Sequence, residues 1–297
     1  MNNILYSKLR LQVPSALDGQ TATITSASGS SRIVTMSNPV TDIMVSGMEQ
    51  YRIQGGDSDE TVGIGYGEIK KVEIIYDIYN TVKNSTSDIT EAQWLSFLNE
   101  GCVAMARSKG ETSAFIGKNV ILSNSVVPDY TSWKIADFNH DSSGNTVDLI
   151  QNNTIYNTAF SSSSQTYSSS TARSWLTGTY LPGFSTDVKN KLQTMTVTTD
   201  GGNTSDKIKL LSVTEVGGSG TSYAPTGEGS QYPIFTASTG STANNSRVRT
   251  GTGVNWWLRS RYTNNTSLAW AVTLTGYLDY FTCSGTCGLL PTIRFAQ

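Results

Sequence analysis

Short runs in which apolar and polar residues alternate fill the first quarter of the chain. They cover residues 9–13, 21–25, 32–36, 42–46, 51–54 and 69–75, and Gly, Ser, Asn and Asp separate them. Alternation with a period of two predicts strands with one buried face, at a spacing typical of a β-sandwich. We therefore expect residues 1–78 to form a small all-β, immunoglobulin-like domain for attachment or assembly. Asp57, Asp59 and Glu60 are expected to lie in a solvated acidic loop of this domain.

Helical spacing begins after residues 79–89, a segment that we expect to be a linker. Thr90 and Gln93 form a capping-box pattern, and apolar residues between Trp94 and Met105 recur at the spacing of a helix. Together these features predict a helix that is capped by Thr90, buries one face and ends near Lys109.

Shorter helices and strands follow in the middle of the chain. The patterns predict strands at residues 133–136, 147–150 and 207–212, helices at 167–176 and 186–195, and a long loop at 217–246. The helix at 167–176 has a serine cap and is expected to turn Trp175 and Leu176 inward. Helices and short strands in one region predict the α+β class, so we expect residues 90–297 to form a second, α+β domain.

In the last forty residues or so, the apolar residues recur at neither the spacing of a strand nor that of a helix. A Trp-rich run at 256–260 is followed by residues dominated by Tyr, Ser, Gly, Thr and Asn, a composition typical of antibody-like binding surfaces. Residues 271–290 also contain no Lys, Glu, Gln, Met or Trp. These are the five amino acids that cannot be reached by randomising the first two bases of an Asn codon that ends in a pyrimidine. The pattern indicates a ligand-binding surface with a variable region at about residues 259–290.

The candidate residues of this surface fall into two groups. A buried scaffold is expected from Trp256, Trp257, Arg259 and Trp270. The candidate ligand-contacting positions, whose alternative interpretation is that of ordinary strand and loop residues, are Tyr262, Asn264, Asn265, Thr266, Leu268, Ala271, Thr273, Tyr277, Asp279, Tyr280, Phe281, Cys283, Thr286 and Cys287.

Composition and charge exclude several other roles. The net charge of -2 and the absence of a Lys/Arg cluster argue against a nucleic-acid partner, and no apolar run is long enough for membrane insertion. The first residues lack the basic and then apolar pattern of a secretion signal, so we expect no Sec-type export. With one His and three Cys in 297 residues, we expect no catalytic site and no cofactor.

Two motifs leave alternatives to that expectation. Cys283 and Cys287 could form a disulfide, half of a metal site or an oxidase pair. Asp137, Asn139 and Asp141, with Asp148 at the twelfth position, have the oxygen spacing of a calcium loop. The expected strands on both sides favour instead a hairpin turn, in which the only histidine, residue 140, is solvated.

Several segments occur in the order found in one known family. They are Trp133-Lys-Ile-Ala136, residues 167–176, residues 206–215, Trp256-Trp-Leu-Arg-Ser260, Ala269-Trp-Ala-Val272 and Gly288-Leu-Leu-Pro-Thr-Ile-Arg-Phe295. Over about residues 88–297 the chain thereby resembles the C-type-lectin-like domain of variable proteins diversified by diversity-generating retroelements, a family that includes phage tropism determinants. The family usually ends Gly-Val-Arg-Pro. Leu290 stands here in place of that Arg, so either the family's local ion pair is missing or this position belongs to the variable set.

The resemblance implies a function. In the family, adenine-directed mutagenesis varies exposed residues on a lectin-type scaffold, which implies a hypervariable receptor-binding protein of a phage. The implied partner is a protein or glycan on a target cell, the implied assembly a homo-oligomer such as a trimer, and the implied location a virion tail or otherwise a cell surface. Alternatives are an oxidase of the related formylglycine-generating type that uses Cys283 and Cys287, or a structural tail protein or lectin without variation.

Overall fold

A computed structural model gives the fold of the chain. It describes residues 7–13, 18–37, 39–45, 49–56, 58–65, 68–73, 78–162, 166–199, 201–219, 221–239, 242–253 and 255–297. The chain divides into two compact units, residues 1–81 and 82–297, here called the N-terminal and C-terminal units.

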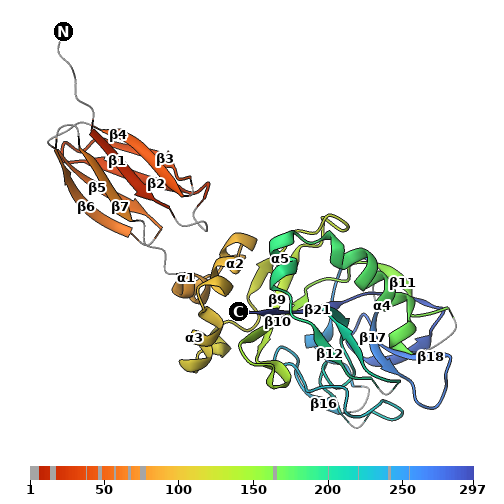
Figure 1. Ribbon diagram of the computed structural model, residues 1–297. Coiled ribbons are helices and arrows are strands. Elements are labelled where there is room, and N and C mark those ends of the chain that lie inside the picture. The colour runs from red at the N-terminus through yellow and green to blue at the C-terminus, as the bar shows by residue number, and fades with distance from the viewer. Residues whose placement is uncertain are drawn as a thin grey trace. The chain divides into compact units, whose positions relative to one another are not determined.

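In the described residues of the N-terminal unit, one mixed and one antiparallel sheet enclose a single core (Figure 1). One sheet has the order β4-β1-β7 and the other the order β3-β2-β5-β6. Strand β1 shows why they pack: Leu9 and Leu11 are fully buried, whereas the alternate residues are not. The strands are β1 (Ser7–Gln12), β2 (Thr21–Ser26), β3 (Ser31–Thr35), β4 (Val40–Val45), β5 (Glu49–Gly55), β6 (Ser58–Ile64) and β7 (Ile69–Glu73).

The prediction of an acidic loop in this unit is wrong for its described residues. Asp59 and Glu60 lie in β6, which pairs with β5, and the carboxylate of Asp59 is 2.6 Å from the guanidinium of Arg52. Both acidic residues are exposed, in a strand whose Val62 and Ile64 are buried. Asp57 and the predicted strand ends at residues 46 and 74–75 lie outside the described residues.

Helix α1 (Ile78–Asn84) occupies much of the segment predicted to be a linker. Helix α2 (Glu91–Asn99) has the predicted capping box: the Thr90 hydroxyl accepts from the Gln93 N–H, and the Gln93 side chain accepts from the Thr90 N–H. The single helix predicted to reach Lys109 is wrong. Gly101 adopts a left-handed backbone (φ 76°), which ends the first helix before α3 (Cys102–Ser108) begins.

Two further helices are shorter than predicted. Helix α4 (Thr171–Trp175) has the expected serine cap, since the Ser170 hydroxyl accepts from the Arg173 N–H. Leu176 is buried, whereas Trp175 is half-buried and stacks on Tyr156 at 4.3 Å. Helix α5 (Thr186–Lys191) ends four residues early, and the chain continues into a strand.

The C-terminal unit contains two five-stranded sheets and two small ones, so the α+β class is confirmed. The first sheet has the order β14-β21-β10-β9-β8 and the second the order β11-β20-β17-β18-β19. The small sheets are β12–β13 and β15–β16. The strands are β8 (Asn119–Ile121), β9 (Ser132–Phe138), β10 (Thr146–Gln151), β11 (Asn157–Ala159), β12 (Met195–Val197), β13 (Thr204–Asp206), β14 (Ile208–Leu210), β15 (Gly218–Ser219), β16 (Ser238–Thr239), β17 (Trp256–Arg261), β18 (Leu268–Val272), β19 (Leu278–Thr282), β20 (Thr286–Gly288) and β21 (Pro291–Ala296).

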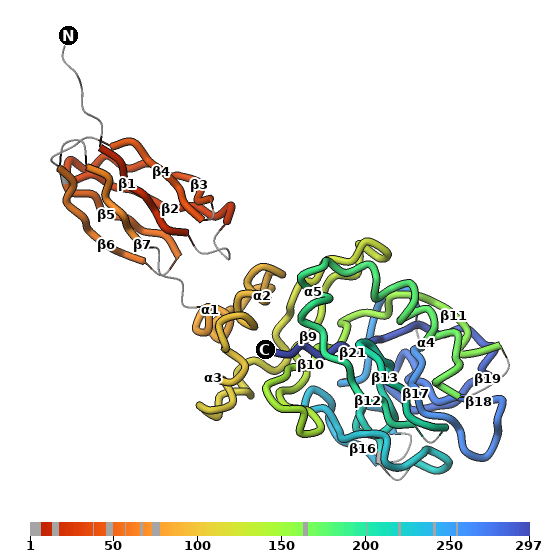
Figure 2. Tube along the Cα trace, viewed as in Figure 1, coloured from red at the N-terminus to blue at the C-terminus, as the bar shows by residue number. Residues whose placement is uncertain are grey.

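One apolar core joins the two five-stranded sheets. Ala136 and Ile150 of the first sheet pack in the same cluster as Trp256, Leu258 and Val272 of the second. The chain trace shows that β11, from the middle of the sequence, is in the same part of the unit as the blue strands β17, β18 and β19, and β20 pairs with β11 in the sheet (Figure 2). The hairpin β18–β19 forms one edge of the second sheet, and Trp270, Val272 and Leu278 join it to the core. Within the described residues, no helix has the length and apolar character that a bilayer crossing requires.

Candidate ligand-binding site

The expected scaffold residues Trp256, Trp257, Arg259 and Trp270, here called the buried frame, are at most 3% exposed. They lie on the neighbouring strands β17 and β18. Each indole N–H has an acceptor: Trp256 donates to Arg247 O (3.2 Å), Trp257 to Thr158 O (2.9 Å) and Trp270 to Tyr223 O (3.3 Å). The frame is thus fixed by both burial and hydrogen bonds, as buried indoles require.

Arg259 is held by a charged network below the sheet. Its guanidinium makes two hydrogen bonds to the carboxylate of Glu215, which Lys209 also contacts at 2.6 Å. Burial by itself would raise the pKa of Glu215, but the charges of Arg259 and Lys209 outweigh it and lower the pKa to about 2. The same guanidinium donates to the carbonyls of Leu210 (2.9 Å) and Glu228 (2.6 Å). Arg259 therefore ties β17 to three separate segments of the unit.

The hairpin of β18 and β19 carries half of the candidate positions. Trp270 is paired with Tyr280 and Ala271 with Asp279. The connecting turn contains Gly276 in the left-handed region (φ 83°), where an added Cβ would lie 2.2 Å from Asn244 O. The backbone of this turn is consequently defined by sterics as well as by its hydrogen bonds.

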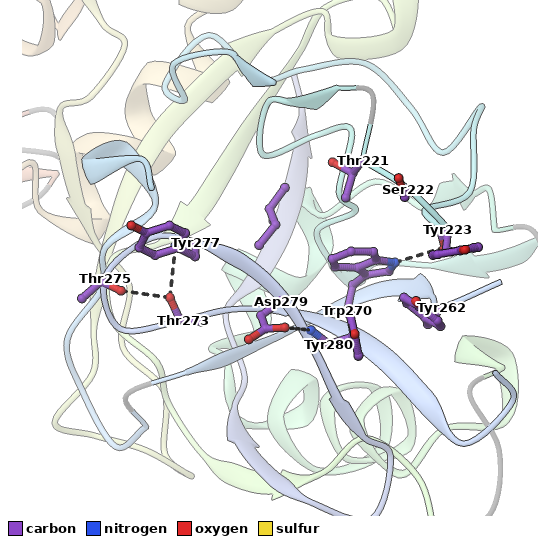
Figure 3. A pocket seen from close by; sticks show the side chains of 11 residues that line it. Thr221, Ser222, Tyr223, Tyr262, Trp270, Thr273, Thr275, Tyr277, Asp279 and Tyr280 are labelled. Carbon is purple, nitrogen blue, oxygen red and sulfur yellow. Dashed lines mark hydrogen bonds between the residues drawn. The ribbon is translucent and has the colours of Figure 1, made fainter. Parts of the chain in front are cut away.

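A concave pocket of about 580 Å³ lies on this hairpin and on a neighbouring loop. It is lined by Thr221, Ser222, Tyr223, Tyr262, Trp270, Thr273, Thr275, Tyr277, Leu278, Asp279 and Tyr280. In the view of Figure 3, Tyr223 and Tyr262 lie on one side of Trp270, whereas Tyr277 lies on the other side with Thr273 and Thr275. The pocket thus has an aromatic end and a hydroxyl-rich end, in line with the mixture of apolar walls and few polar groups typical of ligand sites.

Four rings form the aromatic end and are here called the aromatic cluster: Tyr223, Tyr262, Trp270 and Tyr280. The Tyr262 ring is central, with its centroid 5.1 Å from Tyr223, 5.6 Å from Trp270 and 4.3 Å from Tyr280. Tyr223 and Tyr280 are 50% and 43% exposed, whereas Tyr262 and Trp270 are 8% and 3% exposed. Two buried rings therefore support two rings that are open to solvent.

Tyr223 is one of the few residues other than glycine with a positive φ (62°). This conformation costs an L-residue roughly 1–2 kcal/mol and persists only where the surroundings hold it. Its carbonyl oxygen accepts from both the Trp270 indole and the Thr263 N–H (2.9 Å). The strained residue is thus attached to the frame and presents its ring at the mouth of the pocket.

The electrostatics of the pocket are simple. Asp279 is exposed and is the only acidic lining residue, and no Lys, Arg or His is among the described lining residues. Its carboxylate accepts from the N–H of Tyr280 (2.8 Å). Lost hydration, and then the phenol of Tyr280, raises the pKa of Tyr262, so this ring stays uncharged at neutral pH. The pocket accordingly carries a single negative charge beside uncharged rings.

The structure separates the candidate positions into three groups. Those that line the pocket are Tyr262, Thr273, Tyr277, Asp279 and Tyr280. Those that are exposed or half-buried outside it are Asn264, Asn265, Thr266, Leu268, Phe281 and Thr286. Those that are buried, and so are not available to a ligand at this surface, are Ala271, Cys283 and Cys287.

The buried group corrects the sequence-based list, and each member has a physical reason. Ala271 lies on the inner strand β18 between Trp257 and Asp279 and is fully buried. Cys283 and Cys287 are each 4% exposed, and burial raises the pKa values of their thiols to about 11 and 12. Leu290 is also fully buried in the core, so this side chain contributes to packing and is not available to a ligand at the surface. An aperiodic composition cannot separate such positions from exposed neighbours.

The sequence also missed part of the site. Thr221, Ser222 and Tyr223 come from the segment that was predicted only as a long loop, and Thr275 and Leu278 come from the hairpin itself. The signal for Tyr223 was an aromatic residue within a Ser/Thr/Gly-rich stretch, the same composition that identified the C-terminal segment.

The calcium-loop pattern folds as the turn of a β-hairpin between β9 and β10. Asp148 is buried and forms a two-hydrogen-bond ion pair with Arg294, at 2.6 and 2.8 Å. Asp137 accepts from the N–H of Phe138 and lies 2.8 Å from His140 Nδ1. These carboxylates are therefore already bonded within the protein.

His140 is buried rather than solvated, which corrects the expectation for this side chain. Its ring stacks on Tyr232 with centroids 3.7 Å apart. Ligand atoms of His140, Asp141 and Glu215 lie within 4.8 Å of one another, which is close enough to share a metal ion. However, Glu215 is already engaged by Arg259 and Lys209, and their positive charges oppose a metal cation at this place.

Comparison with protein families identifies one match. The model of the family described as Domain of unknown function (DUF6273) matches residues 130–296, which include β9, β10 and the whole second sheet from β11 onward. Neither a curated protein nor a solved structure matches the chain.

Proposed function

Since the chain belongs to the DUF6273 family, we propose that its C-terminal unit is a ligand-binding module rather than an enzyme. The ligand is received by the pocket on the β18–β19 hairpin and by the exposed residues around it. The buried frame keeps the backbone of this surface in place. Binding needs no bond to be made or broken, and the exposed part of the pocket has the aromatic and hydroxyl composition of recognition surfaces.

One observation carries this proposal: buried and exposed residues are segregated within a single short segment. Trp256, Trp257, Arg259 and Trp270 are at most 3% exposed, whereas Tyr277 and Tyr280 on the next strand and turn are 46% and 43% exposed. Exposed apolar side chains that are scattered singly are ordinary, whereas exposed ones that gather in a patch mark binding sites. Their gathering at one concave site supports recognition.

The finer description of the fold is part of the proposal. Two five-stranded sheets with peripheral helices, and a C-terminal strand β21 within the first sheet, agree with a C-type-lectin-like domain. The two-sheet N-terminal unit agrees with an immunoglobulin-like sandwich used for attachment. The resemblance in residues 88–297 supports the same interpretation.

We extend the proposal to diversification and origin. The C-terminal segment is a variable region of a retroelement-diversified protein, and the chain serves a phage as a receptor-binding protein in the virion. Its partner is a protein or glycan on the host cell. Assembly as a homo-oligomer, for example a trimer, would raise a modest affinity per site through multivalency.

The proposal is tested by two measurements. The first is the DNA beside the gene, where we expect a reverse transcriptase and a near-copy of the segment for residues 259–290 that differs mainly at adenines. The second is binding of the labelled full-length protein to a panel of intact bacterial cells and to a glycan array. We expect Tyr280→Ala to abolish binding and Thr196→Ala, an exposed change in β12 at a residue that is neither a candidate position nor part of the pocket lining, to retain it.

Negative results in the two measurements would contradict different parts of the proposal. Absence of the repeat would remove diversification and favour an unvaried tail protein or lectin. Binding that is unchanged in Tyr280→Ala would remove the pocket as the recognition site. The oxidase alternative gains little from the geometry, because burial raises the pKa values of Cys283 and Cys287 to about 11 and 12 and keeps both thiols protonated at neutral pH.

A further inference from the structure

We infer that the aromatic cluster binds an alkylammonium group of the ligand, such as a trimethylammonium group. This inference rests on the proposed ligand-binding function and specifies the chemistry that the pocket recognises. Cations are attracted to the electron-rich faces of Trp and Tyr rings when they lie within about 6 Å of the ring centroid.

The arrangement of the rings favours a cation over a flat ligand. Around Tyr262, the rings of Tyr223, Trp270 and Tyr280 are inclined by 47°, 45° and 42°, and the rings of Trp270 and Tyr280 are inclined to each other by 86°. Parallel rings would offer one flat platform. Inclined rings that line the same pocket form a concave corner, which suits a compact, roughly spherical group.

The charge of the pocket favours the same class of ligand. Asp279 lies on the strand that carries Tyr280, and the described lining contains no basic residue. A carboxylate attracts a cation and repels phosphates and carboxylates, with a strength that depends on how far water is excluded. No Lys or Arg is among the described lining residues, so no cationic side chain of the lining competes with the ligand for the ring faces.

A neutral sugar is the main competing ligand. The hydroxyl groups of Thr273 and Thr275 line the other end of the pocket and could bond to sugar hydroxyls, although they already lie 3.2 Å from each other. A neutral ligand gains nothing from the negative charge that Asp279 gives the pocket lining. We therefore favour the ammonium group and treat sugar binding as an outcome that would overturn the inference.

The experiment isolates the positive charge. Full-length protein is titrated with choline and, in parallel, with 3,3-dimethylbutan-1-ol, in which carbon replaces the charged nitrogen at nearly the same shape. Binding is followed by NMR. We expect saturable binding of choline and at least about tenfold weaker binding of the alcohol, as for a cation–π site that is partly shielded from water.

Variants connect the effect to the cluster. We expect Tyr280→Ala to weaken choline binding by about fivefold or more, Tyr280→Phe to retain it, and Asp279→Asn to weaken it by roughly two- to fivefold. Thr196→Ala, an exposed change in β12 at a residue that neither lines the pocket nor belongs to the candidate positions, is the control and should have no effect. Thermal unfolding of each variant verifies that the fold is intact.

The outcomes separate this inference from the proposed function. Equal binding of choline and the alcohol, or binding of methyl glucoside but not of choline, would overturn the inference. If no ammonium probe binds while binding to cells still depends on Tyr280, the inference fails and the proposed function stands. If no ammonium probe binds and binding to cells does not depend on Tyr280, both the inference and the pocket's role in the proposed function fail. Phosphocholine and a trimethyl-lysine peptide, added as further probes, distinguish a choline-bearing surface from a methylated protein as the source.

Discussion

Arg259 and Glu215, 44 residues apart in the chain, form a two-hydrogen-bond ion pair that is almost completely removed from solvent. The pair joins strand β17 to the segment after β14, and thus joins the sheet that bears the pocket to the other large sheet. A buried pair of this kind is costly to break because the remaining charge has no access to water.

Removing one partner should therefore destabilise the C-terminal unit strongly. We expect Arg259→Met to lower the free energy of unfolding by about 3–5 kcal/mol, because Glu215 would keep only Lys209 as a charged partner. Urea denaturation measures the change. Lys83→Met, which removes the half-exposed ion pair with Glu111, is the control and should cost less than about 1 kcal/mol. Similar losses in both variants would contradict a special role of the buried pair.

The same carboxylate predicts a dependence of stability on pH. The pKa of Glu215 is about 2 in the folded protein and about 4.3 in an unfolded chain, so its contribution is fully present above pH 4.5. It is lost as the pH falls from about 4.5 toward 2, in total on the order of 3 kcal/mol. Unfolding in urea at several pH values should show a shallower acid dependence in Glu215→Gln. Parallel curves for the two proteins would show that other groups dominate.

Exposed candidate positions should tolerate substitution that the frame does not. We expect Asn264→Ala and Thr286→Ala each to change the free energy of unfolding by less than about 0.5 kcal/mol, since their side chains face solvent. Trp257→Ala should cost about 3–5 kcal/mol, because it leaves a cavity and the Thr158 carbonyl without its indole donor. Differential scanning calorimetry checks all three. An exposed position as sensitive as Trp257 would argue against a surface free to vary.

The thiols of Cys283 and Cys287 should be inert in the native protein. With pKa values raised to about 11 and 12, Cys283 and Cys287 have almost no thiolate at pH 7.5. We expect a thiol-specific aromatic disulfide reagent to react at least about a hundredfold more slowly than with an exposed cysteine peptide. In guanidinium, all three cysteines should react. Rapid reaction in the native state would instead favour the oxidase alternative.

The sequence was sufficient wherever a local rule decided the structure. The capping box at Thr90 was predicted because it depends on residues three positions apart, and a serine cap was predicted for the helix at 167–176 without its position, which is Ser170. The alternation in β1 was enough to predict its buried face. Burial of the frame was also predicted, because three Trp in one short segment rarely remain in water.

The sequence was insufficient wherever long-range packing decided. The break at Gly101 was also missed, although a glycine inside a helical pattern is itself a local signal for a helix end, and the charged residues of β6 concealed a strand. Cys283 and Cys287 have the same local composition as their exposed neighbours, and only the folded sheet distinguishes them. The contribution of Tyr223 to the pocket depends on a contact with Trp270, 47 residues later.

The pocket is made by two stretches of chain that are distant in sequence, the loop around Tyr223 and the hairpin of β18 and β19. Were a cell to mutate only the second stretch, every descendant would meet its target against the same unchanged opposite wall. That inherited wall would bias the whole repertoire toward ligands able to lie against a tyrosine, so relatives with unlike hairpins would still share part of their chemistry of recognition.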